Sequence, residues 1–368
     1  MENIHDNTPD PTLNPTSEQV QDQTAAAQEE TVEPQTEPQT EPHVEALAFE
    51  SRLDLGPLAE KIAAIKHEIN KVIVGQHKTI DRLLVALLAN GHILLEGVPG
   101  VAKTLTAKVL AQTIDTTYSR IQFTPDLMPS DILGTSVFNM QTSTFDFKKG
   151  PIFANLVLID EINRAPAKTQ AALFEVMEER QITIDNLQFK MDLPFLVIAT
   201  QNPIEQEGTY RLPEAQLDRF LFKIEVEYPN LEEEINILAK EHALVGQPKT
   251  AQIERVITPS EIVAFQQLVK QIVVEDNVME YIAKIVHHTR TNPLLYLGAS
   301  PRASLAILNA AKGYAAINNR DFVTPEDIKE AAYPVLIHRV IVAPEREMEG
   351  VTAHDIIQQI VEAIDIPR

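Results

Sequence analysis

The chain has 368 residues, a formal net charge of −22 and no cysteine. The absence of cysteine excludes a disulfide framework, a thiolate zinc site and a thiol nucleophile, and the negative charge argues against broad non-specific nucleic-acid binding. No apolar run approaches the roughly 18 residues needed to span a bilayer, and the N-terminus lacks the features of a signal peptide. We therefore expect a cytoplasmic protein with no membrane span.

Residues 1–50 form a tail of unusual composition. The tail holds twelve acidic residues and no lysine or arginine, and glutamine, threonine and proline are frequent in it. Such a segment has too little apolar surface to offset the entropy lost on folding, so we predict that it is disordered. A spacer is the favoured interpretation, and a docking or solubilising role remains open.

The middle of the chain, residues 51–229, alternates between helical and strand patterns. Two segments with apolar residues at helical spacing come first. Short apolar strands separated by helical segments follow, and fully apolar strands are typical of a parallel sheet covered on both faces. The sequence thus predicts an α/β core with a parallel sheet. The predicted strands are Ile93–Glu96, Arg120–Phe123, Leu156–Asp160, Phe195–Thr200 and Leu221–Val226.

Two stretches interrupt this alternation. Gly134–Lys149 and Arg180–Leu193 each have two short strand patterns around a polar turn, which predicts a β-hairpin in both places. Neither hairpin is needed to build a parallel sheet of this kind. We interpret them as insertions that face another molecule, and edge decoration is the alternative.

After Pro229 only helical patterns are found, and several of them begin with capping signals such as Thr258-Pro259-Ser260-Glu261. Residues 230–368 are therefore predicted to form a separate all-helical domain. The predicted helices are Leu231–Ala243, Pro259–Val273, Asn277–His288, Arg302–Ile317, Pro325–Ile337 and Ala353–Ile364.

A phosphate-binding loop is predicted between the first strand and the next helix. The loop reads GVPGVAKT and has alanine where the general pattern G-x-x-x-x-G-K-[ST] has glycine. Backbone N–H groups of such a loop, together with the helix N-terminus, cradle a triphosphate. Lys103 would reach the β- and γ-phosphates, and the Thr104 hydroxyl would ligate Mg²⁺. The predicted loop residues are Gly97, Val98, Pro99, Gly100, Val101, Ala102, Lys103 and Thr104.

Polar side chains follow two later strands of the predicted sheet. Asp160 and Glu161 end an apolar strand, and the carboxyl ends of parallel strands are where ligands bind. Asp160 would complete the magnesium site, and Glu161 would act as general base for the attacking water. Asn202 follows the next strand, where it could orient that water. A turn-forming Asn before proline is its structural alternative.

An arginine supplied by a neighbouring molecule often completes a site of this kind. Arg219, between a short helix and the last strand, is the best candidate, and Arg164 and Arg211 are rivals. Arg302 begins a helix of the second domain and could reach the phosphates from there. A structural salt bridge is the alternative role for Arg219.

Taken together, these motifs resemble AAA+ ATPases, most specifically the MoxR family. The matching pieces are GVPGVAKT, LVLIDEINRAPAKTQAALFEVMEE, VIATQNPIEQEGTYRLPEAQLDRFLFKI and GASPRAS. The resemblance covers the chain from about Leu58 to Arg339, and alanine before Lys103 is usual in that family.

The resemblance implies an AAA+ core with a helical lid and a homo-oligomeric ring, commonly a hexamer, with ATP and Mg²⁺ at subunit interfaces. It makes Asn202 the first sensor, Arg219 the arginine finger and Arg302 the second sensor, and it places both hairpins at the ring pore. MoxR-like proteins resemble chaperones that mature protein complexes, often with von Willebrand factor A domain partners.

The favoured hypothesis is a ring ATPase that remodels protein clients. A nucleotide-dependent switch or scaffold with little hydrolysis, a nucleic-acid motor and a chelatase-type subunit remain alternatives. Nucleic acid is not expected as a partner, because both hairpins carry few basic residues and the chain has few aromatic residues for stacking.

Overall fold

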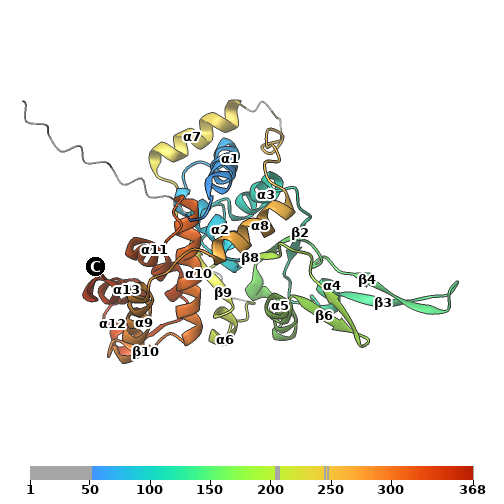
Figure 1. Ribbon diagram of the computed structural model, residues 1–368. Helices are drawn as coiled ribbons and strands as arrows, with labels where there is room; N and C mark the ends of the chain where they lie inside the picture. The colour runs from blue at the N-terminus through green and yellow to red at the C-terminus, as the bar shows by residue number, and fades with distance from the viewer. Residues whose placement is uncertain (1–51, 204–207, 244–245, 247, 368) are drawn as a thin grey trace, which may run out of the picture. The chain divides into compact units, whose positions relative to one another are not determined.

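The computed structural model describes residues 52–203, 208–243, 246 and 248–367 (Figure 1). The tail that was predicted to be disordered, residues 1–50, lies outside the described residues. Among the helices that the structure describes, none is both long and apolar enough to cross a membrane.

A five-stranded parallel sheet forms the centre of the core, with strand order β2-β5-β8-β1-β9. Asp160 at the end of β5 is paired with Gln122 on β2, and Glu96 at the end of β1 is paired with Gln201 on β8. The carboxyl ends of these strands therefore share one edge, as a parallel sheet requires. The strands are β1 (His92–Glu96), β2 (Tyr118–Gln122), β5 (Leu156–Asp160), β8 (Leu196–Gln201) and β9 (Phe220–Glu225).

Helices cover both faces of the sheet, because successive side chains of a strand point to opposite faces. In β5, Leu156 and Leu158 belong to one hydrophobic cluster, and Val157 and Ile159 belong to another. The first cluster includes residues of α1 (Gly56–Val72), α2 (His77–Leu88) and α3 (Lys103–Thr113). The second includes residues of α4 (Pro129–Leu133) and α5 (Ala167–Glu179).

Both predicted hairpins are confirmed. The strands β3 (Gly134–Asn139) and β4 (Thr144–Lys149) pair antiparallel, and so do β6 (Gln181–Ile184) and β7 (Leu187–Lys190). Figure 1 shows that the β3–β4 hairpin extends away from the sheet. Apolar side chains are exposed on it, including Phe138, Met140 and Phe145.

The prediction that only helices follow Pro229 is wrong. A short antiparallel ribbon joins β10 (Leu295–Leu297) to β11 (Ile341–Val342). Strands of three and two residues are too short to show an alternating pattern, so the sequence did not reveal them. The helices of this part are α7 (Leu231–Ala243), α8 (Pro259–Lys270), α9 (Asp276–Thr291), α10 (Pro301–Ile317), α11 (Pro325–Leu336), α12 (Pro344–Met348) and α13 (Ala353–Ala363).

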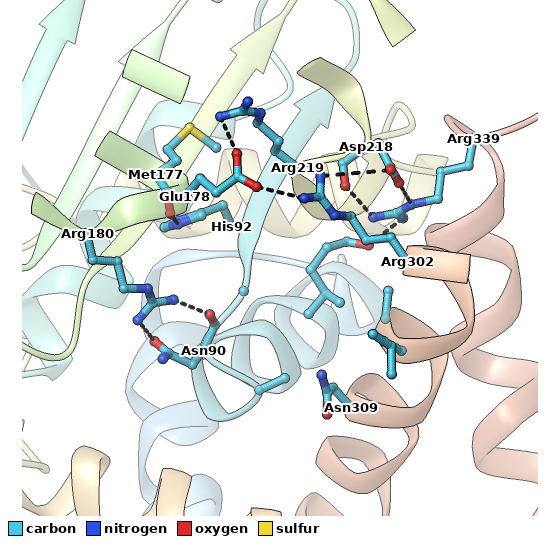
Figure 2. Close-up of a pocket in the computed structure, with 15 residues that line it drawn as sticks. Asn90, His92, Met177, Glu178, Arg180, Asp218, Arg219, Arg302, Asn309 and Arg339 are labelled. Atoms are coloured by element: carbon cyan, nitrogen blue, oxygen red, sulfur yellow. Dashed lines mark hydrogen bonds and ion pairs between the residues drawn. The ribbon is translucent and has the colours of Figure 1, made fainter. Parts of the chain in front are cut away.

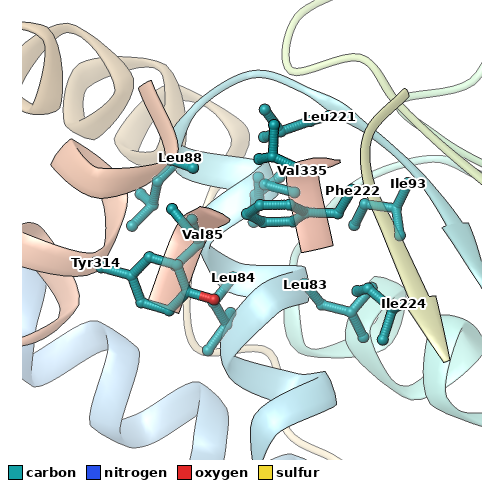
Figure 3. Packing of buried hydrophobic residues seen from close by; sticks show 14 of the residues in the cluster. Leu83, Leu84, Val85, Leu88, Ile93, Leu221, Phe222, Ile224, Tyr314 and Val335 are labelled. Atoms are coloured by element: carbon teal, nitrogen blue, oxygen red, sulfur yellow. The ribbon is translucent and has the colours of Figure 1, made fainter. Parts of the chain in front are cut away.

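These helices share a hydrophobic cluster with the sheet. Figure 3 shows Val85 of α2, Phe222 of β9 and Tyr314 of α10 in this cluster, together with Val335 of α11. A Cβ atom at Gly313 of α10 would lie 2.8 Å from the Val85 side chain, so glycine allows α10 to approach α2 closely. Because the cluster runs through both parts, the predicted boundary between a core and a separate helical domain stays a proposal.

A buried histidine makes the stability of this fold depend on pH. Nδ1 of His92 accepts from the Val197 N–H, and Nε2 lies 3.0 Å from the Met177 carbonyl. Burial, with a smaller effect of Arg180, lowers the pKa of His92 to about 3. Burial likewise lowers the pKa of His338.

The unfolding free energy should therefore fall as the solution is acidified. The unfolded chain takes up protons below about pH 6.5 while the folded imidazoles stay neutral, so each histidine costs about 1.4 kcal/mol per pH unit below that value. Urea unfolding of the wild type and of His92→Gln between pH 7 and 5 tests this. The variant should show a slope smaller by that amount, and equal slopes would contradict the assignment.

Candidate nucleotide site

The loop between β1 and α3 has the backbone that the phosphate-loop prediction requires. Gly100 and Ala102 have positive φ angles of 91° and 61°. A Cβ atom at Gly97 would lie 2.7 Å from the Val226 carbonyl oxygen, so only glycine fits there. Ala102 occupies a left-handed conformation that costs a residue other than glycine about 1–2 kcal/mol. The loop is thus held in a strained turn at the start of α3.

The two side chains that open α3 connect the loop to neighbouring strands. The Lys103 ammonium donates to the carbonyl oxygens of Gly97 and, at 3.3 Å, of Gln201. The Thr104 hydroxyl donates to Asp160 Oδ1 at 3.2 Å. The structure therefore brings together the lysine, the threonine and the first carboxylate that the sequence predicted.

Asp160 is buried and accepts hydrogen bonds from three side chains. The donors are Thr104, Thr200 at 3.2 Å and Arg120 Nε at 2.6 Å. Oxygens on adjacent corners of a Mg²⁺ octahedron lie about 3 Å apart, so the Thr104 hydroxyl and Asp160 Oδ1 fit one such ion. Among the described residues, no group of three acidic, histidine or cysteine side chains could hold a metal alone. Mg²⁺ in nucleotide sites takes most of its ligands from phosphate and water.

Glu161 leaves the strand with a left-handed backbone, φ 58°, and precedes the short helix η1 (Ile162–Arg164). Its N–H donates to the Thr200 hydroxyl at 3.0 Å. Its carboxylate accepts from the Gln122 amide at 2.8 Å and pairs with Arg164 Nε at 3.0 Å. The side chain is about one third exposed, so water can reach the carboxylate.

Asn202 is buried and follows β8 directly. Since Gln201 is paired with Glu96, Asn202 lies at the same sheet edge as the phosphate loop. Its predicted position is confirmed, whereas its role as a sensor stays a prediction.

Arg219 and Arg302 lie together at a second location (Figure 2). Arg219 follows α6 (Glu214–Leu217), and Arg302 is the second residue of α10. Both pair with Glu178 of α5 at 2.7 Å. Arg302 also lies 3.9 Å from Asp218. A cavity of about 270 Å³ is lined by these four residues and by further arginines, Arg180 and Arg339.

The predicted site residues thus form two groups. The loop and the acidic pair make one, and the two arginines make the other; none of Lys103, Thr104 or Asp160 lines the arginine cavity. The structure pairs Arg302 with Glu178 of α5 beside Arg219, and a contact of Arg302 with the phosphates stays a prediction. A side chain at the start of α10 follows the packing of that helix, which the local motif does not reveal.

The rival arginines lie elsewhere. Arg164 is bound to Glu161, within the first group. The Arg211 side chain is 88% exposed, and its Nη2 lies 3.9 Å from Oε1 of Glu214, which makes a weak ion pair. The choice of Arg219, and not Arg164 or Arg211, as the residue that acts on another subunit stays a prediction.

Comparisons with known proteins identify the family of this chain. The family model described as ATPase family associated with various cellular activities (AAA) matches residues 92–222, and the AAA lid domain model matches residues 287–360. Chaperone MoxR1 of Mycobacterium tuberculosis is 42% identical over 326 residues, covering 84% of this chain and 85% of that protein. The chain belongs to the MoxR family of AAA+ ATPases.

Two further relatives are similar to most of this MoxR-family chain. The Bacillus subtilis protein YeaC is 46% identical over 317 residues, which cover 85% of this chain and 96% of YeaC. A crystal structure of a proposed ATPase from Cytophaga hutchinsonii has a TM-score of 0.79 at 42% identity and covers 85% of this chain and 97% of that one. Family membership confirms the resemblance and implies nucleotide binding and ATPase activity.

Sequence reasoning missed three side chains of this MoxR-family site. Gln76 donates to the Val101 carbonyl of the loop at 3.0 Å and lines a cavity of about 650 Å³. Arg120 holds the Asp160 carboxylate, and Glu178 holds both arginines. For Gln76, the turn formed with Gly75 before α2 is a weak sequence signal of a functional position. Nothing in the local pattern distinguishes Arg120 or Glu178 from other exposed charges.

Proposed function

We propose that this chain binds ATP with Mg²⁺ and hydrolyses it in a homo-oligomeric ring, at sites shared by neighbouring subunits. The observation that carries the proposal is the separation of the site residues into two groups. The phosphate loop and the acidic pair can hold and attack the nucleotide, whereas Arg219 and Arg302 are held apart from them on Glu178. Two neighbouring subunits can combine both groups around one triphosphate.

Within one subunit, the loop N–H groups and Lys103 bind the phosphates, and Thr104 and Asp160 hold Mg²⁺. Magnesium neutralises phosphate charge as a Lewis acid. Glu161 accepts the proton of the attacking water, and its contacts with Gln122 and Arg164 fix its carboxylate. Asn202 orients the same water from the end of β8.

The neighbouring subunit supplies Arg219 and Arg302. Charge accumulates on the phosphate oxygens in the transition state, and guanidinium groups stabilise it by hydrogen bonds and by their charge. The exposure of both arginines supports this assignment, since their side chains are 30% and 46% exposed. Arg302 is the second residue of α10, and this helix links the contact to the lid.

Hydrolysis would drive the remodelling of protein clients. The exposed apolar side chains of the β3–β4 hairpin support contact with unfolded or loosely folded protein at a ring pore. The relative named Chaperone MoxR1 supports the same task. A hexameric ring, a cytoplasmic location and partners with von Willebrand factor A domains are further parts of this proposal.

The per-subunit rate of ATP hydrolysis should depend on protein concentration. A site completed by a neighbour works only in the assembly, so dilution should lower the rate in step with dissociation, and removing Mg²⁺ with a chelator should abolish it. Phosphate release and light-scattering mass, both measured at saturating ATP over a dilution series, test this. A monomer that keeps the full per-subunit rate would contradict the shared site.

A further inference from the structure

We propose that Glu178 is a positioning residue for ATP hydrolysis, which holds the core arginine Arg219 and the lid arginine Arg302 as one unit facing the neighbouring subunit's nucleotide. This inference rests on the proposed function, because it requires the two arginines to act on a neighbour. It adds a residue to which neither the motifs nor the comparisons assign a role.

The carboxylate of Glu178 divides its two oxygens between the arginines. Oε2 lies 2.7 Å from Arg219 Nη1, and Oε1 lies 2.7 Å from Arg302 Nη2 (Figure 2). Two guanidinium groups this close repel each other, and a shared carboxylate offsets that repulsion. Glu178 thereby joins side chains that come from different parts of the chain, one after α6 and one on α10.

The backbone around Arg219 is fixed independently of Glu178. The buried guanidinium of Arg339 pairs with the Asp218 carboxylate at 2.6 Å and donates to the carbonyl of Phe220 at 2.6 Å. Asp218 also accepts from the Ser300 hydroxyl at 3.2 Å, just before α10. Because these contacts already hold the backbone on both sides of Arg219, we assign to Glu178 the orientation of the arginine side chains.

The arginines keep donors for a further anion. Arg219 uses Nη1 for Glu178 and for the Phe174 carbonyl, at 2.7 Å each. Its Nε is buried and has no hydrogen-bond partner among the described residues. The buried Nε is out of reach of another molecule, whereas the side chain as a whole is 30% exposed. The phosphate of a neighbouring subunit's nucleotide would therefore meet the exposed part of the guanidinium, whose remaining N–H groups suit an anionic oxygen.

Glu178 is poorly placed to serve folding alone. Its side chain is 37% exposed, and exposed ion pairs contribute little to stability. The helix α5 is instead anchored by buried side chains such as Leu173, Phe174 and Met177. Arg180, the other nearby cation, is held by Asn90 and does not need Glu178.

Steady-state ATP hydrolysis by Glu178→Ala and Glu178→Gln tests the proposal. Free arginines sample many orientations, so kcat should fall about 10-fold in the alanine variant while KM for ATP changes less than about 2-fold. Glu178→Gln keeps one acceptor oxygen for one of the two arginines and should fall in between. The thermal midpoint should stay close to the wild type in both. The matched control is Glu179→Gln, an exposed glutamate on the same helix, which should leave kcat unchanged.

A double variant separates positioning from any other role. In an Arg219→Ala background, Glu178→Ala should lower kcat by less than about 3-fold, because its main partner is already gone. An undiminished kcat in Glu178→Ala, a rise in kcat, a change confined to KM, or a full 10-fold loss in the double variant would each overturn the role of Glu178. Wild-type turnover in Arg219→Ala alone would instead overturn the shared site itself.

Discussion

Replacing Arg219 with alanine should lower ATP turnover by about 10³- to 10⁵-fold, the range that an arginine supplied by a neighbour contributes in related phosphoryl transfers. ATP affinity should change little, because the loop and Lys103 bind the phosphates within each subunit. Phosphate release and equilibrium binding of a fluorescent ATP analogue measure the two effects separately. Arg211→Ala is the matched control, since that arginine is exposed and far less constrained, and it should retain wild-type turnover.

Mixing two inactive variants gives a sharper form of the same prediction. Arg219→Ala keeps a working loop, and Lys103→Ala keeps a working arginine. In randomly mixed rings, about a quarter of the interfaces would combine both intact halves, so the mixture should regain a comparable fraction of wild-type turnover. A mixture as inactive as either parent would show that Arg219 acts within its own subunit or not at all.

The second large effect is expected for Glu161→Gln, which should lower turnover by about 10³-fold, within the range of general base catalysis. Glutamine has nearly the same shape and keeps an acceptor for Gln122, so the fold and ATP binding should persist. Single-turnover hydrolysis and retention of labelled ATP provide the measurement. Turnover near that of the wild type would remove Glu161 from its role, and a loss of ATP binding would point to damage of the loop.

The parts of the site that the sequence predicted are those with a local signature. The glycine loop is a contiguous motif, and Asp160, Glu161 and Asn202 follow buried strands that appear as apolar runs. Parallel pairing then brings strand ends together, so local patterns were enough to place these side chains at one edge.

The remaining contacts join residues far apart in the chain. Glu178 meets Arg302 across 124 positions, and Arg120 meets Asp160 across 40. Such pairs depend on how α10 packs against the core and on which strands are neighbours, and single-sequence patterns carry neither kind of information. For this reason the contact of Arg302 with Glu178 was not predicted.

The strand β9 connects Arg219 to the phosphate loop. Arg219 directly precedes β9, and Val226, directly after it, donates to the Glu96 carbonyl and lies against Gly97 of the phosphate loop. Six residues at about 3.3 Å each thus set a span of about 20 Å between the phosphate loop and Arg219. Because side chains of a strand alternate between faces, adding or deleting one residue in β9 would turn buried side chains such as Phe222 and Ile224 away from the core, so this span is fixed by the packing of the sheet.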